Sequence, residues 1–394
     1  MKRCETEPRP HWRAKVEQEG LIFHTDEDGV SYWAEDTYYE FNPVEISVIE
    51  KTTNDLSEMA LQAAEHVLDK KRYAELGISP RLVRLIERSW DEDHFSLYGR
   101  LDLAFGPDGV PKLLEYNADT PTGLLEAAVI QWTWLKDKFT SKQDQFNSIH
   151  EKLIAKWKDV FEEGSLMHFA YVAENWEDEI TTAYLQDTAT QAGLVTNRMF
   201  MQEIGSTSGR NPHFVDLNLN EIQTLFKLYP WEWLVQEDAD RINATNTILC
   251  EPAWKILLSG KGILPILWEL FPNHPNLLPA SFTPTTFPSG TVKKPMFGRE
   301  GANVTIRHAD GTEVSSDGVY GDNSVVAAGG KFVYQAYTPL AEPGATYHPV
   351  IGSWLVDQGA AGMGIREATT QITANLSRFV PHVIQPMSRF DLIE

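Results

Sequence analysis

The sequence has very little cysteine. Among 394 residues there are only Cys4 and Cys250, in no paired spacing typical of a zinc site. This excludes a disulfide framework and predicts a reducing, cytoplasmic setting. Long apolar runs are also missing, because no stretch approaches the roughly 18 residues of a membrane helix. The first twelve residues, MKRCETEPRPHW, lack the apolar core of a secretory signal. We therefore expect no association with a membrane.

Positive charge is scarce as well. There are 34 Lys and Arg against 56 Asp and Glu, a net charge of −22. Such a surface repels nucleic acid and attracts cations, so amines such as polyamines are compatible small partners. The same acidity is equally a plain solubility trait. Twelve tryptophans, some in the runs QWTW and PWEW, are therefore expected to pack in the core and at its rim rather than stack on bases.

Several common catalytic signatures are absent from the sequence. It has no G-x-S-x-G elbow, no H-E-x-x-H zinc motif, no Walker A loop and no G-x-G-x-x-G opening a helix after a strand. Cys250 lies in an apolar setting, TILCEPAW, which raises a thiol pKa and disfavours a nucleophile. The chemistry must therefore come from other residues.

The periodicity of apolar residues predicts an α+β, or mixed α/β, fold. Helical spacing covers 54–76, the segment from Pro80 and the segment after Gly123. A strand–helix–strand unit follows, which favours a partly parallel sheet covered by helices. The last third reads as short antiparallel strands separated by turns. The strand–helix–strand unit is expected at 167–173, 177–193 and 195–201, and the short strands at 291–297, 302–308, 331–340, 348–357 and 361–370.

Residues 97–123, LYGRLDLAFGPDGVPKLLEYNADTPTG, read as a hairpin with a Pro-Asp-Gly turn. Side chains alternate along a strand, so Arg100 and Asp102 share one face, and Glu115 and Asn117 share a face of the returning strand. Oxygen ligands of this kind suit Mg²⁺ held against a nucleotide, with the arginine neutralising charge that develops during reaction. A solvent-facing hairpin with surface ion pairs explains the spacing equally well.

Three further segments carry candidate residues. KKPMFGREGANV places a strand lysine before Gly298 and Gly301, so its backbone could close over phosphates, although most such hairpins are simple turns. Lys261, after Gly260, stands at the mouth of an apolar run; a solvated lysine fits it as well. Gln335 lies in a strand suited to reading adenine, and Arg366 could clamp a carboxylate, although surface arginine is the default.

Four segments together resemble the synthetase domain of the glutathionylspermidine synthase family. They are YGRLDLAF…LLEYNADTPTG, EPAWKILLSGKGILPILWELFPNHPNLL, KKPMFGREGANV and YQAYTPL…GSWLVDQGAAGMGIRE. They occur in order over nearly the whole chain, and are most similar to stand-alone members described as acid–amine ligases. The resemblance implies an ATP-grasp fold with a permuted segment order. We expect one synthetase unit over 1–394: a mostly helical part (1–95), a metal-binding hairpin and helix (96–165), a substrate-side lobe (166–250) and a lysine and lid lobe (251–394).

The resemblance also implies ATP and Mg²⁺ as cofactors and assigns roles to individual residues. Arg100 resembles the arginine that stabilises the transition state. The other roles group as follows: Asp102, Glu115 and Asn117 as Mg²⁺ ligands; Arg100, Leu101, Asp102, Lys261, Lys294, Gly301, Gln335, Ala336, Tyr337, Thr338, Gln371, Ile372 and Thr373 as ATP contacts; and Thr120, Thr122, Asp178, Glu179 and Arg366 as substrate contacts.

The sequence departs from the family pattern in two places. The synthetase motifs begin near residue 97, which leaves too little chain for the N-terminal Cys/His amidase domain of the bifunctional members, so we expect no hydrolysis of the product. TPTG at 120–123 stands where the family has a serine-containing run at its thiol-peptide site. The acid substrate is therefore open between glutathione and another peptide.

The sequence thus predicts an ATP-dependent carboxylate–amine ligase that works through an acyl phosphate, with a small acid and an amine such as a polyamine as substrates. Two alternatives stay open. One is the same fold acting on a different acid and amine, such as a cell-wall precursor. The other is an ATP-binding regulatory module without catalysis, which the intact set of candidate ligands and lysines disfavours. Nucleic acid and membrane partners are not expected.

Overall fold

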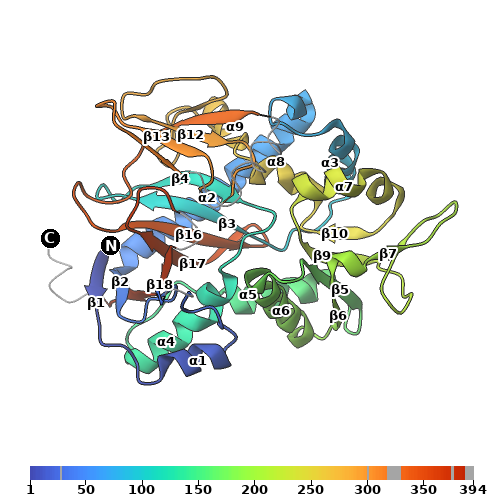
Figure 1. Ribbon diagram of the computed structural model, residues 1–394, viewed down its shortest axis with the longest axis horizontal. Helices are drawn as coiled ribbons and strands as arrows, with labels where there is room; N and C mark the ends of the chain where they lie inside the picture. Colours follow the sequence, from blue (N-terminus) through green and yellow to red (C-terminus); the bar gives the residue numbers. More distant parts are fainter. Residues whose placement is uncertain (27–28, 300, 317–329, 374–376, 387–394) are drawn as a thin grey trace.

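The computed structural model describes residues 1–26, 29–299, 301–316, 330–373 and 377–386. Figure 1 shows helices and sheets closely intermixed. No helix in the described ranges is both long and apolar enough to cross a membrane.

A five-stranded antiparallel sheet lies at the centre, in the order β18-β17-β16-β3-β4. The predicted hairpin forms it together with strands from the last third of the chain. Helix α2 (Pro43–Lys70) packs against β4, β16 and β17. The strands are β3 (Tyr98–Phe105), β4 (Pro111–Asn117), β16 (His348–Val356), β17 (Gly359–Ala368) and β18 (Arg378–Val380).

A second antiparallel sheet, in the order β11-β15-β12-β13-β14, lies at the top of Figure 1. The short antiparallel strands of the last third therefore divide between two sheets. The strands are β11 (Ala280–Ser281), β12 (Thr291–Pro295), β13 (Val304–Arg307), β14 (Glu313–Ser316) and β15 (Phe332–Ala336). β11 lies within the turn-rich stretch that follows α9 (Ile263–Leu270).

The predicted strand–helix–strand unit is confirmed as part of a parallel sheet in the order β10-β9-β5-β6. Helices α5 and α6 pack against each other beside it, and α7 follows β9 directly. The strands are β5 (Leu166–Tyr171), β6 (Val195–Phe200), β9 (Thr224–Leu228) and β10 (Ile248–Cys250). The helices are α5 (Ile149–Val160), α6 (Trp176–Gln191) and α7 (Trp231–Ala244).

The bounds of the first long helix differ from the prediction of 54–76. Asn42 and Glu45 form a capping box, with Pro43 at the first turn, so α2 begins eleven residues earlier. Lys71 then adopts a left-handed conformation and ends the helix at Lys70. The helix predicted from Pro80 is confirmed as α3 (Pro80–Asp91).

Smaller elements complete the chain. Trp33, Trp134, Trp157, Trp231 and Trp354 are fully buried, as predicted for core tryptophans. The remaining elements are β1 (Lys2–Glu5), β2 (Thr37–Phe41) and β19 (His382–Ile384) in one sheet; the pair β7 (Gly205–Ser206) and β8 (Phe214–Val215); helices α1 (Trp12–Gln18), α4 (Gln131–Lys138) and α8 (Ile256–Ser259); the 3₁₀ turns η1 (Arg72–Ala74), η3 (Met201–Glu203) and η4 (Ala253–Lys255); and the π-helix η2 (Glu126–Ile130).

Candidate active site

The hairpin of β3 and β4 carries a connected polar group. Its register pairs Arg100 with Asn117 and Asp102 with Glu115. Arg100 donates to Asp102 through Nε (2.6 Å) and Nη2 (3.0 Å). Asn117 Nδ2 donates to Asp102 Oδ2 at 3.1 Å and to Glu115 Oε1 at 3.3 Å. The side chains of Arg100 and Asp102 are each only 14% exposed, so this face is not a freely solvated ribbon.

Several neighbouring residues fix the position of the Arg100 side chain. Its guanidinium lies 5.6 Å from the centre of the Trp354 ring, and Nη1 donates to the Thr122 carbonyl at 2.7 Å. Gly352 makes room for it, because a Cβ there would lie 2.7 Å from Arg100 Cδ. Burial opposes the charge, but Asp102 more than offsets this and raises the pKa of Arg100. Nη1 and Nη2 each carry a second N–H that a ligand can accept from.

Two lysines from separate elements reach the same hairpin. Lys261, between α8 and α9, forms an ion pair with Glu115 (Nζ to Oε2, 2.8 Å) and donates to the Gly298 carbonyl at 2.8 Å. Lys294, on β12, donates to the Leu114 carbonyl at 3.0 Å and to Gln335 Oε1 at 2.7 Å. The solvated lysine considered for Lys261 is therefore not what the structure shows.

Burial and charge oppose each other in this group. Burial acts to raise the pKa of Glu115, but Lys261 and Lys294 lower it to about 2. Burial lowers the pKa of Lys294 to about 8, against the attraction of Glu115. The cluster thus combines a firmly ionised carboxylate with a lysine that can lose its proton near neutral pH.

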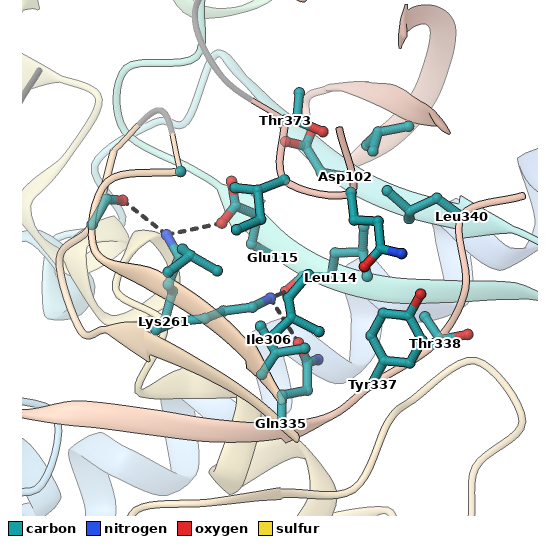
Figure 2. A pocket seen from close by; sticks show the side chains of 18 of the residues that line it. Asp102, Leu114, Glu115, Lys261, Ile306, Gln335, Tyr337, Thr338, Leu340 and Thr373 are labelled. Carbon is teal, nitrogen blue, oxygen red and sulfur yellow. Dashed lines mark hydrogen bonds and ion pairs between the residues drawn. The ribbon is translucent and has the colours of Figure 1, made fainter. Parts of the chain in front are cut away.

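These groups form one end of a cleft between the central sheet and the second sheet (Figure 2). The cleft encloses about 830 Å³ of space not filled by atoms, part of which is open to solvent. Charged groups gather at Asp102, Glu115 and Lys261, while Tyr337 and Leu340 lie toward the other end. The predicted ATP contacts that line it are Asp102, Lys261, Lys294, Gly301, Gln335, Ala336, Tyr337, Thr338, Gln371, Ile372 and Thr373.

Two details refine the predicted nucleotide contacts. The Gln335 amide is already used, because Oε1 accepts from Lys294 and Nε2 donates to the Leu113 carbonyl at 3.0 Å. Because both the oxygen and the nitrogen of this amide are engaged, we expect the strand at Gln335 to contact a ligand through atoms other than this side-chain amide. Gly301 has a positive φ of 70°, and a Cβ there would lie 2.6 Å from the Thr373 carbonyl oxygen. The glycine thus lets the loop close directly on 371–373.

A second, smaller cavity of about 370 Å³ adjoins the cleft. Asp102, Val350 and Thr373 line both, so the two spaces meet at the hairpin. Arg100 and Arg366 lie in the wall of the smaller cavity, together with Thr122. Two guanidinium groups and a hydroxyl suit a carboxylate next to the charged end of the cleft.

Some predicted site residues lie elsewhere. Leu101 is fully buried in the core, so its side chain does not reach the cleft. Asp178 and Glu179 lie in the first turn of α6, and neither lines either cavity. Thr120 lines neither cavity, but its hydroxyl accepts from Arg299 at 3.0 Å.

Arg299 is a site residue that sequence reasoning missed. It links Thr120 to Glu232 of α7 (Nη2 to Oε1, 2.8 Å), and its guanidinium lies 5.3 Å from the centre of the Trp233 ring. Burial opposes the charge, but Glu232 raises the pKa of Arg299. The available signal was its place in the loop KKPMFGREGANV, next to Gly298.

Glu126 was missed as well. It is 2% exposed, in the π-helix behind the smaller cavity, and Oε1 accepts from Tyr32 at 2.7 Å. Burial raises the pKa of this carboxyl to about 7, although the Tyr32 hydrogen bond lowers it. Nothing in the apolar stretch GLLEAAVI marks it in the sequence.

Without a nucleotide, the oxygen donors at this site would fill only part of the coordination shell of a magnesium ion. No cluster of three or more His, Cys, Asp or Glu side chains arranged for a metal occurs in the part of the chain that the structure describes. Asp102 and Glu115 present two carboxylates side by side, which is the hard-oxygen chemistry that Mg²⁺ prefers when phosphates complete its shell. The Asn117 amide now turns its nitrogen toward both carboxylates and must rotate to offer its oxygen.

Comparison with known proteins adds independent information. The model of the family described as "Glutathionylspermidine synthase preATP-grasp" matches residues 3–385. A Haemophilus influenzae protein named "Putative acid–amine ligase" is 43% identical over 369 residues, which cover 91% of this chain and 92% of that protein. Trypanothione synthetase of Crithidia fasciculata is 27% identical over 346 residues, which cover 80% of this chain. The matched residues cover 51% of the trypanothione synthetase, so the chain spans about half the length of this relative.

A solved structure has a similar fold. The glutathione synthetase like-effector from Globodera pallida, in its apo form, matches with a TM-score of 0.58 over 96% of this chain and 98% of its own. Identity is only 10%, so the likeness concerns the fold alone. The predicted mixed α/β, ATP-grasp-like fold is thereby confirmed, and the permuted segment order stays a prediction.

Proposed function

The chain belongs to the glutathionylspermidine synthase family of C–N ligases, and we propose that it joins a carboxylic acid to an amine through an acyl phosphate made from ATP. The observation that carries this proposal is the junction of the two cavities. A cleft with two lysines meets, at Asp102, a smaller cavity with two arginines. Phosphate and carboxylate would therefore lie next to each other.

In this proposal ATP occupies the larger cleft. Lys261 and Lys294 hold the phosphates, and Tyr337 and Thr338 lie at the adenine end. Asp102 and Glu115, with Asn117 after its amide rotates, would hold Mg²⁺. When bound, the ion would offset the negative charge of the phosphates, including the charge that develops as the phosphoryl group is transferred. Catalysis then comes mainly from positioning and electrostatics.

The reaction has two steps. A carboxylate oxygen attacks the terminal phosphorus of ATP, so that an O–P bond forms and the bond to ADP breaks. The amine nitrogen then attacks the acyl carbon, the C–N bond forms, phosphate leaves, and the amine proton passes to solvent. We assign to Arg100 the stabilisation of the tetrahedral oxyanion, because two of its N–H groups are not used by Asp102 or Thr122.

The acid is proposed to be glutathione or another peptide, and the amine a polyamine. Thr122 and Arg366 lie in the wall of the smaller cavity, where the acid would bind. Thr120 is two residues before Thr122 in the chain. Asp178 and Glu179 lie at the first turn of α6 and would attract a cationic amine at the approach to the site. A net charge of −22 favours such a substrate.

The experiment is an ADP-release assay with ATP, Mg²⁺ and a matrix of acids and amines that includes glutathione and spermidine. Acids that accelerate release are then tested with ¹⁸O in the carboxylate. We expect one ¹⁸O atom to appear in the released phosphate. Tight binding of a nucleotide without acceleration by any pair would instead favour the regulatory-module reading, and release without ¹⁸O transfer would exclude the acyl phosphate.

A further inference from the structure

Residues 118–123 form a short segment that leaves β4 and runs past the smaller cavity; we call it the crossing segment. It contains both threonines proposed to contact the acid. Three of its polar atoms face the central sheet or the loop after β12. The Thr122 carbonyl accepts from Arg100 at 2.7 Å, the Pro121 carbonyl accepts from Tyr98 at 3.2 Å, and the Thr120 hydroxyl accepts from Arg299. Its position therefore decides what the acid would contact.

Asp119 contacts the parallel-sheet lobe instead. It is 1% exposed and forms an ion pair with Lys227 of β9, which is fully buried (Nζ to Oδ1, 2.8 Å). Its second oxygen accepts from the Trp231 backbone N–H at 2.9 Å, at the first turn of α7. Lys227 also donates to the Tyr229 carbonyl at 2.9 Å and lies 4.6 Å from the centre of the Trp231 ring.

The Asp119 carboxylate thus replaces a helix cap. Trp231 is the first residue of α7, so its N–H has no intrahelical partner, and the preceding Pro230 offers no side-chain cap. An anion at a helix N-terminus is also favoured by the helix dipole. The next residue of α7, Glu232, binds Arg299, which in turn binds Thr120. The crossing segment is therefore tied to the start of α7 at two successive residues.

Stability alone does not explain a fully buried ion pair. The cost of removing both charges from water commonly offsets their attraction, and a well-packed apolar pair of similar size is often as stable. What the pair adds is a fixed orientation of the Asp119 side chain, because each of its carboxylate oxygens accepts from one donor. With the carboxylate fixed on one side and the Pro121 and Thr122 carbonyls on the other, rotation of the segment is restricted.

We propose that Asp119 and Lys227 are positioning residues of the acid-substrate site. Their ion pair holds the crossing segment against α7, so that Thr120 and Thr122 stay beside the smaller cavity and the Thr122 carbonyl stays with Arg100. The inference rests on the proposed function, because it assigns the smaller cavity to the acid. It adds a determinant of acid recognition that lies outside both cavity linings.

The test uses the full chain with the double variant Asp119→Asn/Lys227→Met, which leaves no unpaired buried charge. The matched control is Arg9→Met/Glu35→Gln, which removes an equally buried pair (2.7 Å) outside the cavity linings of the described residues. We expect the KM for the acid that is most active with the wild type to rise about tenfold or more, with the KM for ATP within about twofold. The control should change neither KM.

Hydrogen–deuterium exchange supplies a readout that needs no substrate. Amides of residues 118–123 should exchange faster in the double variant, and those of the hairpin at 98–117 should not. Lys227→Arg keeps the charge and serves as a second variant if the double variant does not fold; it should give a smaller change in the same direction.

Either of two results in the double variant would overturn the proposal: unchanged exchange of 118–123 with an unchanged acid KM, or equal rises of the acid and ATP KM values. The same acid-specific rise in the Arg9/Glu35 control would also overturn it. If no acid stimulates ADP release by the wild type, the proposed function fails. In that case the hydrogen–deuterium exchange experiment still shows whether the Asp119–Lys227 ion pair holds the crossing segment in place.

Discussion

Lys294 should make nucleotide binding depend on pH. Burial lowers the pKa of this lysine to about 8, whereas Glu115, with a pKa of about 2, stays ionised at every pH of interest. With a pKa of about 8, about 90% of the lysine is charged at pH 7 and about 9% at pH 9. If only the ammonium form holds the phosphates, the Kd is divided by the charged fraction, and it rises about tenfold from pH 7 to pH 9.

The assay is calorimetric titration of a non-hydrolysable ATP analogue with Mg²⁺ at pH 7, 8 and 9. The control is Lys294→Arg, because a guanidinium stays charged throughout this range. Its Kd should change little between pH 7 and pH 9. Equal wild-type Kd values at the two ends would refute the reasoning. So would the same rise in the arginine variant, because another group would then be titrating.

Three further changes give distinct expectations. Arg100→Ala should leave the Kd of the ATP analogue within about twofold but lower kcat by about 100-fold or more, as for loss of an oxyanion donor; unchanged amide formation would remove Arg100 from catalysis. Gly352→Ala should lower kcat without changing analogue binding, because its Cβ would lie 2.7 Å from Arg100 Cδ. Burial lowers the pKa of His382 to about 3, so stability present above pH 6.5 should be lost as the pH falls toward 3, by up to about 5 kcal/mol. Urea unfolding of His382→Gln should show a flatter acid limb than the wild type.

The hairpin shows how far local spacing leads. The alternation of side chains predicted that Arg100 and Asp102 would face Glu115 and Asn117, and the register confirms it. The same spacing left open whether that face was solvated. The answer depends on β12, which brings Lys294 onto the Leu114 carbonyl from far along the chain. Local periodicity carries no information about such a cover.

For Gln335, the sequence predicted the strand but not the hydrogen-bond partners of the side chain. Its strand was predicted correctly, and its place on the cleft was implied by the family resemblance. What could not be predicted is that its amide is occupied by Lys294 and by the Leu113 carbonyl. A buried amide must find partners, and which ones it finds depends on strands that are distant in sequence.

In the proposed function, the crossing segment would let nucleotide and acid recognition vary separately. The larger cleft, where ATP is proposed to bind, is built from the two antiparallel sheets, whereas Asp119 anchors the segment to β9 and α7 of the parallel-sheet lobe. Changes at the start of α7 would move Thr120 and Thr122 without disturbing Lys261 or Lys294. The run at 120–123 is also where the family resemblance predicts a departure from the serine-containing pattern. We therefore expect the choice of acid among relatives to follow substitutions in this segment and in the first turn of α7, and the nucleotide contacts to tolerate them.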